Sequence, residues 1–171
     1  MGYSRGQAVC YASAYWDKVC DDGYVATIGQ PAYVKQQAGA KLTELSIPHE
    51  EDCTHFVSRC LGKLGGGLNI PNESGLALGI LSAPVLVYYL AAKSRLAVKI
   101  LEKAPKQDAW DFIDNLAPGD VIAYFPTTGK DYGHTAFYIG DGRVACHSIC
   151  RWGDDFDEPA GSSLVTLLHI V

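Results

Sequence analysis

The stretch HTAFYIGDGRVACHSI, residues 134–149, constrains the fold of this chain more than any other. Two runs rich in β-branched and aromatic residues flank an Asp-Gly pair, which is a strong signal for a β-hairpin with a tight turn. Before it, "APGD" is typical of a turn, and the run VIAYF at 121–125 is typical of a strand. We therefore expect an antiparallel sheet in the last third of the chain.

The turn length sets which side chains of this hairpin share a face. A two-residue turn at 141–142 places His147 opposite Ala136, on the same face as His134 and one diagonal step from it. A three-residue turn would instead put Ser148 on that face. We expect the two-residue turn.

The first half of the chain has helical periodicity. Ser4 with Gln7 three residues later predicts a helix start, and apolar residues at helical spacing extend that helix over about residues 5–20. A second helix is expected to begin near Asp52 and to end at the glycines of "GKLGGG", 62–67. Helices followed by an antiparallel sheet predict an α+β fold.

Residues 75–92 contain no charged side chain. Eighteen residues is the lower limit for a membrane span, and Gly79, Ser82 and Pro84 interrupt the run. We expect no stable membrane span, but a buried helix that starts near Ser82 and lines the core or a groove.

Composition limits the function classes further. A chain of 171 residues is expected to form one domain, 1–171, with a sizeable core. The net charge of −5 and the absence of a Lys/Arg cluster argue against a nucleic-acid partner. The N-terminus shows no signal-peptide pattern, so we expect another machine to deliver the protein to its place of action.

Six cysteines at positions 10, 20, 53, 60, 146 and 150 fit no CxxC zinc motif. One or two disulfides and buried thiols are both consistent with this pattern, and no metal or other cofactor is expected.

Cys53 directly follows Asp52 at the expected helix start. The positive end of a helix dipole lowers the pKa of a cysteine there and favours the thiolate. A histidine on a nearby strand can accept its proton and a further polar group can orient that histidine, so Cys53, His134 and His147 are candidate catalytic residues.

Three motifs resemble one enzyme family. "DCTHFVSRCLG" (52–62), "YSRGQAVCYASAYW" (3–16) and "APGDVIAYF…GHTAFYIGDGRVACHS" (117–148) resemble papain-like cysteine amidases and peptidases of the NlpC type, especially their amidase-domain branch. The spacing of thirteen residues between His134 and His147 is one longer than that group usually has.

The resemblance implies a papain-like fold, with an N-terminal helical lobe packed on a small antiparallel sheet. It implies Cys53 as nucleophile, His134 as base and His147 as the orienting group. The substrate implied is an amide of bacterial peptidoglycan stem peptides, and the reaction is acyl transfer without a cofactor. Asp52, which also fits a helix N-cap, and Tyr132 are candidate substrate-binding residues, whereas His55 is expected to be peripheral.

Alternative functions have specific signatures. The hairpin region also resembles lipid acyltransferases of the lecithin–retinol type, but there the nucleophile follows the histidines, whereas Cys53 precedes them. A non-catalytic binding module and a toxin acting on a host protein stay open. A compact amidase is consistent with an antibacterial effector, delivered by a type VI-like apparatus to the periplasm or cell wall, or with a phage lysis enzyme. An effector of this kind implies an immunity protein that covers the cleft.

Overall fold

The computed structural model describes residues 2–73, 79–149, 151–159, 161 and 163–171. It is an α+β fold in which all paired strands are antiparallel. The larger sheet has six strands in the spatial order β3-β8-β4-β5-β6-β7. Their bounds are β3 Ala97–Pro105, β4 Val121–Pro126, β5 His134–Gly140, β6 Arg143–Cys146, β7 Arg151–Asp155 and β8 Ser163–Ile170.

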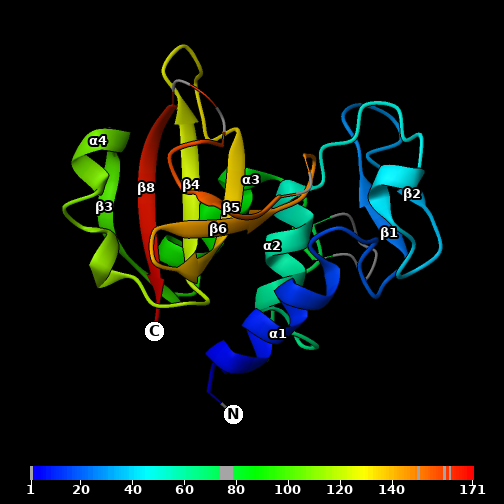
Figure 1. Cartoon of the computed structure of the whole chain (residues 1–171), viewed down its shortest axis with the longest axis horizontal. Coiled ribbons are helices and arrows are strands. Elements are labelled where there is room, and N and C mark those ends of the chain that lie inside the picture. The colour runs from blue at the N-terminus through cyan, green and yellow to red at the C-terminus, as the bar shows by residue number, and fades with distance from the viewer. Residues whose placement is uncertain (1, 74–78, 150, 160, 162) are drawn as a thin grey trace.

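A two-stranded sheet and several helices complete the fold. The small sheet pairs β1 Tyr24–Ala26 with β2 Tyr33–Lys35. The helices are α1 Arg5–Tyr15, α2 Cys53–Leu61, α3 Ala83–Tyr88 and α4 Lys106–Ala109, with the π-helical turn η2 Tyr89–Lys93 and the 3₁₀ turns η1 Leu42–Glu44 and η3 Ile113–Asn115. In Figure 1, α2 stands between the six-stranded sheet and the β1–β2 unit.

The six-stranded sheet has a buried core on each face. On one face, Phe137 and Ala145 pack with Phe56 and Leu61 of α2 and with residues of α1 and α3. The opposite core contains sheet residues such as Tyr138, together with Ala109 at the end of α4 and Phe156 after β7. Successive residues of β5 point to opposite faces, so Phe137 belongs to one core and its neighbours Ala136 and Tyr138 to the other.

The helix starts agree with the sequence predictions. Ser4 accepts a hydrogen bond from the backbone N–H of Gln7, and Cys53 is the first residue of α2. α1 ends at Tyr15 rather than near residue 20, because the N–H of Val19 bonds to the carbonyl of Ala40 across the chain instead of continuing the helix.

The uncharged run at 75–92 also contains the helix that was predicted there. Ser82 is the N-cap of α3, with Pro84 in its first turn, and the helix continues through η2. Residues 74–78 lie outside the described part of the chain. Among the described helices, none combines the length and the apolar character that a bilayer crossing requires.

Candidate active site

Asp52 and Cys53, at the start of α2, have side chains with different surroundings. Phe56, Val57, Cys60 and Leu61 are fully buried and fix the helix against the sheet, and Gly62 ends it. The first intrahelical hydrogen bond of α2 runs from the Phe56 N–H to the Asp52 carbonyl, so the N–H groups of Cys53 and Thr54 precede the ladder. This is the polar end of the helix on which Cys53 lies.

Asp52 occupies the N-cap position, but its side chain makes no capping hydrogen bond. Its fully buried carboxylate instead accepts from the Ala26 N–H at 2.5 Å, from His55 Nδ1 at 2.9 Å and from His147 Nδ1 at 2.7 Å. Burial opposes the charged form, but His55 and His147 outweigh it and lower the pKa of Asp52 to about 2. Asp52 lies outside the lining of the Cys53 cavity described below.

His55 lies between two carboxylates. It is absent from the lining of the Cys53 cavity, as its position on another side of the helix predicted, but it is fully buried and not peripheral. Its Nδ1 faces Asp52, and its Nε2 lies 2.8 Å from Asp22 Oδ2. Burial opposes the protonated ring, but the charges and hydrogen bonds of Asp52 and Asp22 raise the pKa of His55 to about 10. Both ring nitrogens therefore donate, and His55 is a buried cation.

His147 closes the same network from the end of the hairpin. Its Nδ1 bonds to Asp52, its Nε2 lies 2.7 Å from the carbonyl oxygen of Tyr15, and its ring stacks on Phe56 at a centroid distance of 4.1 Å. The structure thus joins His147 to Asp52 and not to His134. We call Asp22, Asp52, His55 and His147 the buried polar network.

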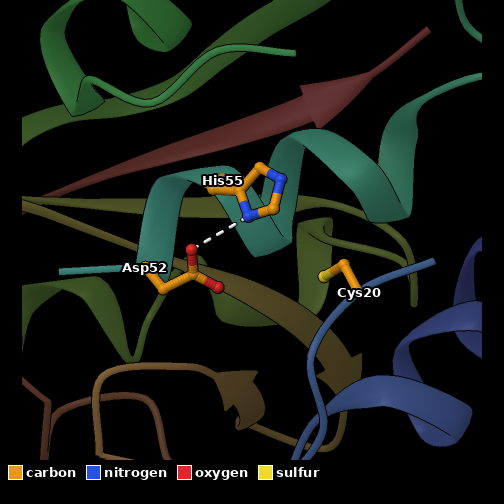
Figure 2. Close-up of side chains that lie close together, drawn as sticks. All are labelled: Cys20, Asp52 and His55. Atoms are coloured by element: carbon orange, nitrogen blue, oxygen red, sulfur yellow. Dashed lines mark hydrogen bonds and ion pairs between the residues drawn. The ribbon is translucent and has the colours of Figure 1, made fainter. Parts of the chain in front are cut away.

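Cys20 lies beside this network, and Figure 2 shows it with Asp52 and His55. One potential ligand atom of each lies within 4.8 Å of the others, and thiolate, carboxylate and imidazole are all zinc ligands. The ring nitrogens of His55 already donate to carboxylates, and burial raises the pKa of the Cys20 thiol well above its usual value. A metal would have to displace all of these protons, so we describe the group as a hydrogen-bonded ion network.

Cys53 belongs to the other side of the helix start. It lines a cavity of about 370 Å³ between the β1–β2 unit, the start of α3 and the loop before β5. Tyr132 and Gly133 of that loop line it too, and so do the carboxylate-bearing residues Glu51 and Glu73. The structure therefore brings Cys53 and Tyr132 to one cavity.

Cys53 is 3 % exposed, and burial raises the pKa of its thiol. The backbone N–H of Thr135 and the Thr54 hydroxyl, whose oxygen lies 3.7 Å from Sγ, oppose that rise without reversing it. The expectation that the helix start lowers this pKa is therefore wrong, because loss of water around the sulfur is the larger effect.

His134 points to the opposite face of β5 from Cys53. Thr135 donates to the Thr54 hydroxyl of α2 at 3.1 Å, so the neighbouring His134 side chain points away from α2. Its ring lies 5.2 Å from that of Tyr124, and it lines a separate cavity of about 300 Å³, which Gly133, Cys146 and His147 line too.

Nε2 of His134 is buried and has no hydrogen-bond partner among the described residues. Burial, together with the cations Arg151 and Lys106, lowers the pKa of this histidine to about 4. The ring is therefore neutral at pH 7.

The register of the hairpin explains why the side chains of His134 and His147 point to different faces. The two-residue turn is confirmed, since Gly140 pairs with Arg143. A β-bulge then shifts the register by one, and Phe137 pairs with Ala145. Continued to the strand ends, this register puts His147 opposite Thr135 on the α2 face, so the prediction that it shares a face with His134 is wrong.

Some sequence signals for the missed residues existed. Asp52 and His55 are three apart in one helical turn, a spacing at which an acid and a base interact. Asp22 and the backbone N–H of Thr135 carry no local signal, because only the tertiary fold brings them to the helix start.

The cysteine pattern is partly resolved. Cys10, Cys20, Cys53 and Cys60 are free thiols, with Cys10 exposed and the other three buried. Cys150 lies outside the described residues, so the choice between a disulfide and a thiol stays open at that position.

Comparison with known protein families gives a match for the first part of the chain. Residues 2–78 match the family model described as "Putative amidase domain", a stretch that contains α1 and the Cys53 helix. No curated protein and no solved structure matches the chain.

Proposed function

From the amidase-like character of residues 2–78, we propose that the protein is a cysteine-dependent amidase with a papain-like arrangement. One observation carries this proposal. Within the matched stretch, the cysteine that begins α2 is also the cysteine that lines a cavity of about 370 Å³. Of the other described cysteines, Cys20, Cys60 and Cys146 are buried and Cys10 is exposed on α1, and Cys146, which lines the His134 cavity, lies outside the matched stretch.

In the proposed reaction, the Cys53 thiol gives its proton to a base, and the sulfur attacks the carbonyl carbon of the substrate amide. A C–S bond forms, and the negative charge moves to the carbonyl oxygen. The N–H groups of the first turn of α2 are positioned to bind that oxyanion. The C–N bond then breaks, the amine leaves with a proton from the base, and water hydrolyses the thioester.

We propose His134 as that base. Its pKa of about 4 leaves it neutral and able to accept a proton at pH 7, and its Nε2 has no partner among the described residues. It directly precedes Thr135, whose N–H approaches the sulfur. Because the ring lies on the face of β5 opposite Cys53, catalysis then requires the backbone to rearrange at the start of β5, beside Gly133, which lines both cavities, so that the ring reaches Cys53. His55 and His147 are unsuitable as bases, because each ring nitrogen already faces an acceptor.

The substrate class proposed is the amide bond of bacterial peptidoglycan stem peptides. Its support is the resemblance of residues 3–16, 52–62 and 117–148 to cell-wall amidases and peptidases. In this proposal the enzyme acts on the cell wall from the periplasm as a delivered effector or lysis enzyme, and an immunity protein inhibits it by covering the Cys53 cavity.

The test is mass spectrometry of purified peptidoglycan before and after incubation with the protein. We expect new products that correspond to hydrolysis of one stem-peptide amide, and their loss in Cys53→Ala. Cys10→Ala is the matched control, because it removes an exposed thiol outside the cavity. Equal digestion by Cys53→Ala and the wild type would overturn the cysteine mechanism.

A further inference from the structure

A second cavity, of about 470 Å³, adjoins the Cys53 cavity. Pro84 and Tyr132 line both of them, so the second cavity lies next to the first, along α3. A substrate that places its scissile amide at Cys53 therefore has room for a flanking segment in the second cavity.

The floor of the second cavity is apolar. It is formed by side chains of α3 and η2, among them Val85, Val87, Tyr88, Ala91 and Ala92. Val85 is 40 % exposed and Tyr88 62 %, so the described residues leave much of this floor open to solvent. Aliphatic and aromatic groups of a substrate gain free energy by covering such a surface.

One cation of the second cavity, Lys103, has no anionic partner among the described residues. The Lys103 ammonium lies 4.5 Å from the ring centroid of Phe125 and 5.7 Å from that of Tyr132, the residue shared by both cavities. No carboxylate of the described residues forms an ion pair with it. Lys99, which lines the same cavity, is paired with Glu102, so those two charges cancel.

The remaining charged group of the second cavity is Asp131. Its Oδ1 accepts the N–H of Tyr132 at 2.8 Å, and the residue carries a charge opposite to that of Lys103. Lys103 favours a negatively charged group of the substrate, and Asp131 favours a positively charged one. A substrate anion near Lys103 would therefore be repelled by Asp131.

We propose that the second cavity binds a substrate segment that has an apolar side chain and a free carboxylate, and that Lys103 recognises the carboxylate. This rests on the proposed function, since it treats the two cavities as the path of an amide substrate. The aromatic faces of Phe125 and Tyr132 hold the ammonium in place, which reduces the conformational entropy lost when it pairs with an anion.

The test uses a synthetic peptidoglycan stem pentapeptide with a free C-terminal carboxylate, and the same peptide as a C-terminal carboxamide. We expect the wild type to prefer the carboxylate peptide by about tenfold in kcat/KM. Lys103→Gln should abolish that preference and Lys103→Arg should retain it. Asp131→Asn should increase it by about two- to threefold. Lys63→Gln, an exposed lysine after α2, is the matched control and should leave it unchanged.

A parallel titration of both peptides into the Cys53→Ala protein, followed by NMR, separates this inference from the proposed function. Lys103-dependent binding of the carboxylate peptide without cleavage by the wild type would support the subsite and overturn the amidase. Equal cleavage of both peptides, unaffected by Lys103→Gln, would overturn the subsite alone. A stronger preference for the carboxylate peptide in Lys103→Gln, together with a weaker preference in Asp131→Asn, would also overturn it, because the cavity would then select a cation.

Discussion

Asp52 and Cys53 are neighbours in sequence but belong to regions with opposite bonding. On the Asp52 side, each ring nitrogen of His55 and His147 faces an acceptor, and both carboxylate oxygens of Asp52 have partners. On the Cys53 side, the sulfur meets the Thr54 hydroxyl and the Thr135 N–H beside a cavity of about 370 Å³.

In the proposed function, this difference separates the residues that hold the site in place from the residue that reacts. Buried charges are stable only when they are paired and hydrogen-bonded, so the buried polar network ties α1, the β1 strand and the end of the hairpin to the start of α2. A nucleophile must keep space for its substrate, and the cavity beside Cys53 provides it. In our view the network fixes the position of Cys53 without taking part in proton transfer.

The largest effect is expected from a substitution of the proposed base on the Cys53 side. His134→Gln should lower kcat/KM on peptidoglycan by about 10²–10⁴-fold, because it removes the proposed base while it retains a side chain of similar length. His49→Asn, a change of an exposed loop histidine with positive φ, should leave the rate unchanged. Steady-state kinetics on the three proteins make the comparison. Full activity in His134→Gln would show that the base lies elsewhere.

The next largest effect is expected from a substitution in the buried polar network. His55→Ala should lower the free energy of unfolding by about 3–5 kcal/mol, because it leaves the buried carboxylates of Asp52 and Asp22 without their cation. Urea denaturation followed by circular dichroism measures this loss. The control is His169→Ala, whose partly exposed ring pairs with Asp120 and should cost about 1 kcal/mol or less. Equal losses in both variants would mean that the buried polar network contributes no special stability.

The sequence predicted features that depend on neighbouring residues, but not features that depend on tertiary contacts. Local signals located the start of α1 at Ser4, the start of α2 at Cys53 and the two-residue turn of the hairpin, because caps and tight turns depend on neighbouring residues. The strands β3 and β8 were not predicted. They pair with each other across some seventy residues, and each is defined by tertiary contacts more than by its own pattern.

The site was predicted as a set of residues, not as an arrangement. Cys53 and Tyr132 do share a cavity, but one bulged residue in β5 turned His147 toward Asp52 instead of His134. Since side chains alternate along a strand, a single extra residue exchanges the faces, and the hairpin sequence gives no signal for that residue. The pKa of Cys53 is raised instead of lowered for a similar reason, because burial is a property of the whole fold.

The pH dependence of stability compares the two regions in one protein. His134 has a folded pKa of about 4 against 6.5 when unfolded, so the unfolded chain binds the extra proton and stability falls as pH drops from 6.5 to 4. His55 has a folded pKa of about 10, so its contribution is complete below pH 6.5 and is lost as pH rises from 6.5 to 10. We expect the melting temperature to be highest near pH 6.5.

Variants assign the two limbs of that profile. His134→Gln should flatten the acid limb between pH 6.5 and 4 and leave the alkaline limb in place, as measured by thermal melting at one-unit pH steps. A melting temperature that keeps rising from pH 6.5 to 9 would contradict the assignment of His55 as a buried cation.

The smallest expected effect concerns the order of thiol reactivity, which sharpens the description of the cavity. Iodoacetamide should label Cys10 first, because it is exposed, then Cys53, and Cys60 last. Burial raises the pKa of both Cys53 and Cys60, but only Cys53 lines the cavity, so the reagent reaches its sulfur without unfolding of α2. Peptide mapping by mass spectrometry over time, in wild type and in Cys10→Ala, measures the order. If Cys60 were labelled before Cys53, the cavity would not give access to the sulfur, and the side of the helix that we regard as reactive would be as closed as the side that is paired.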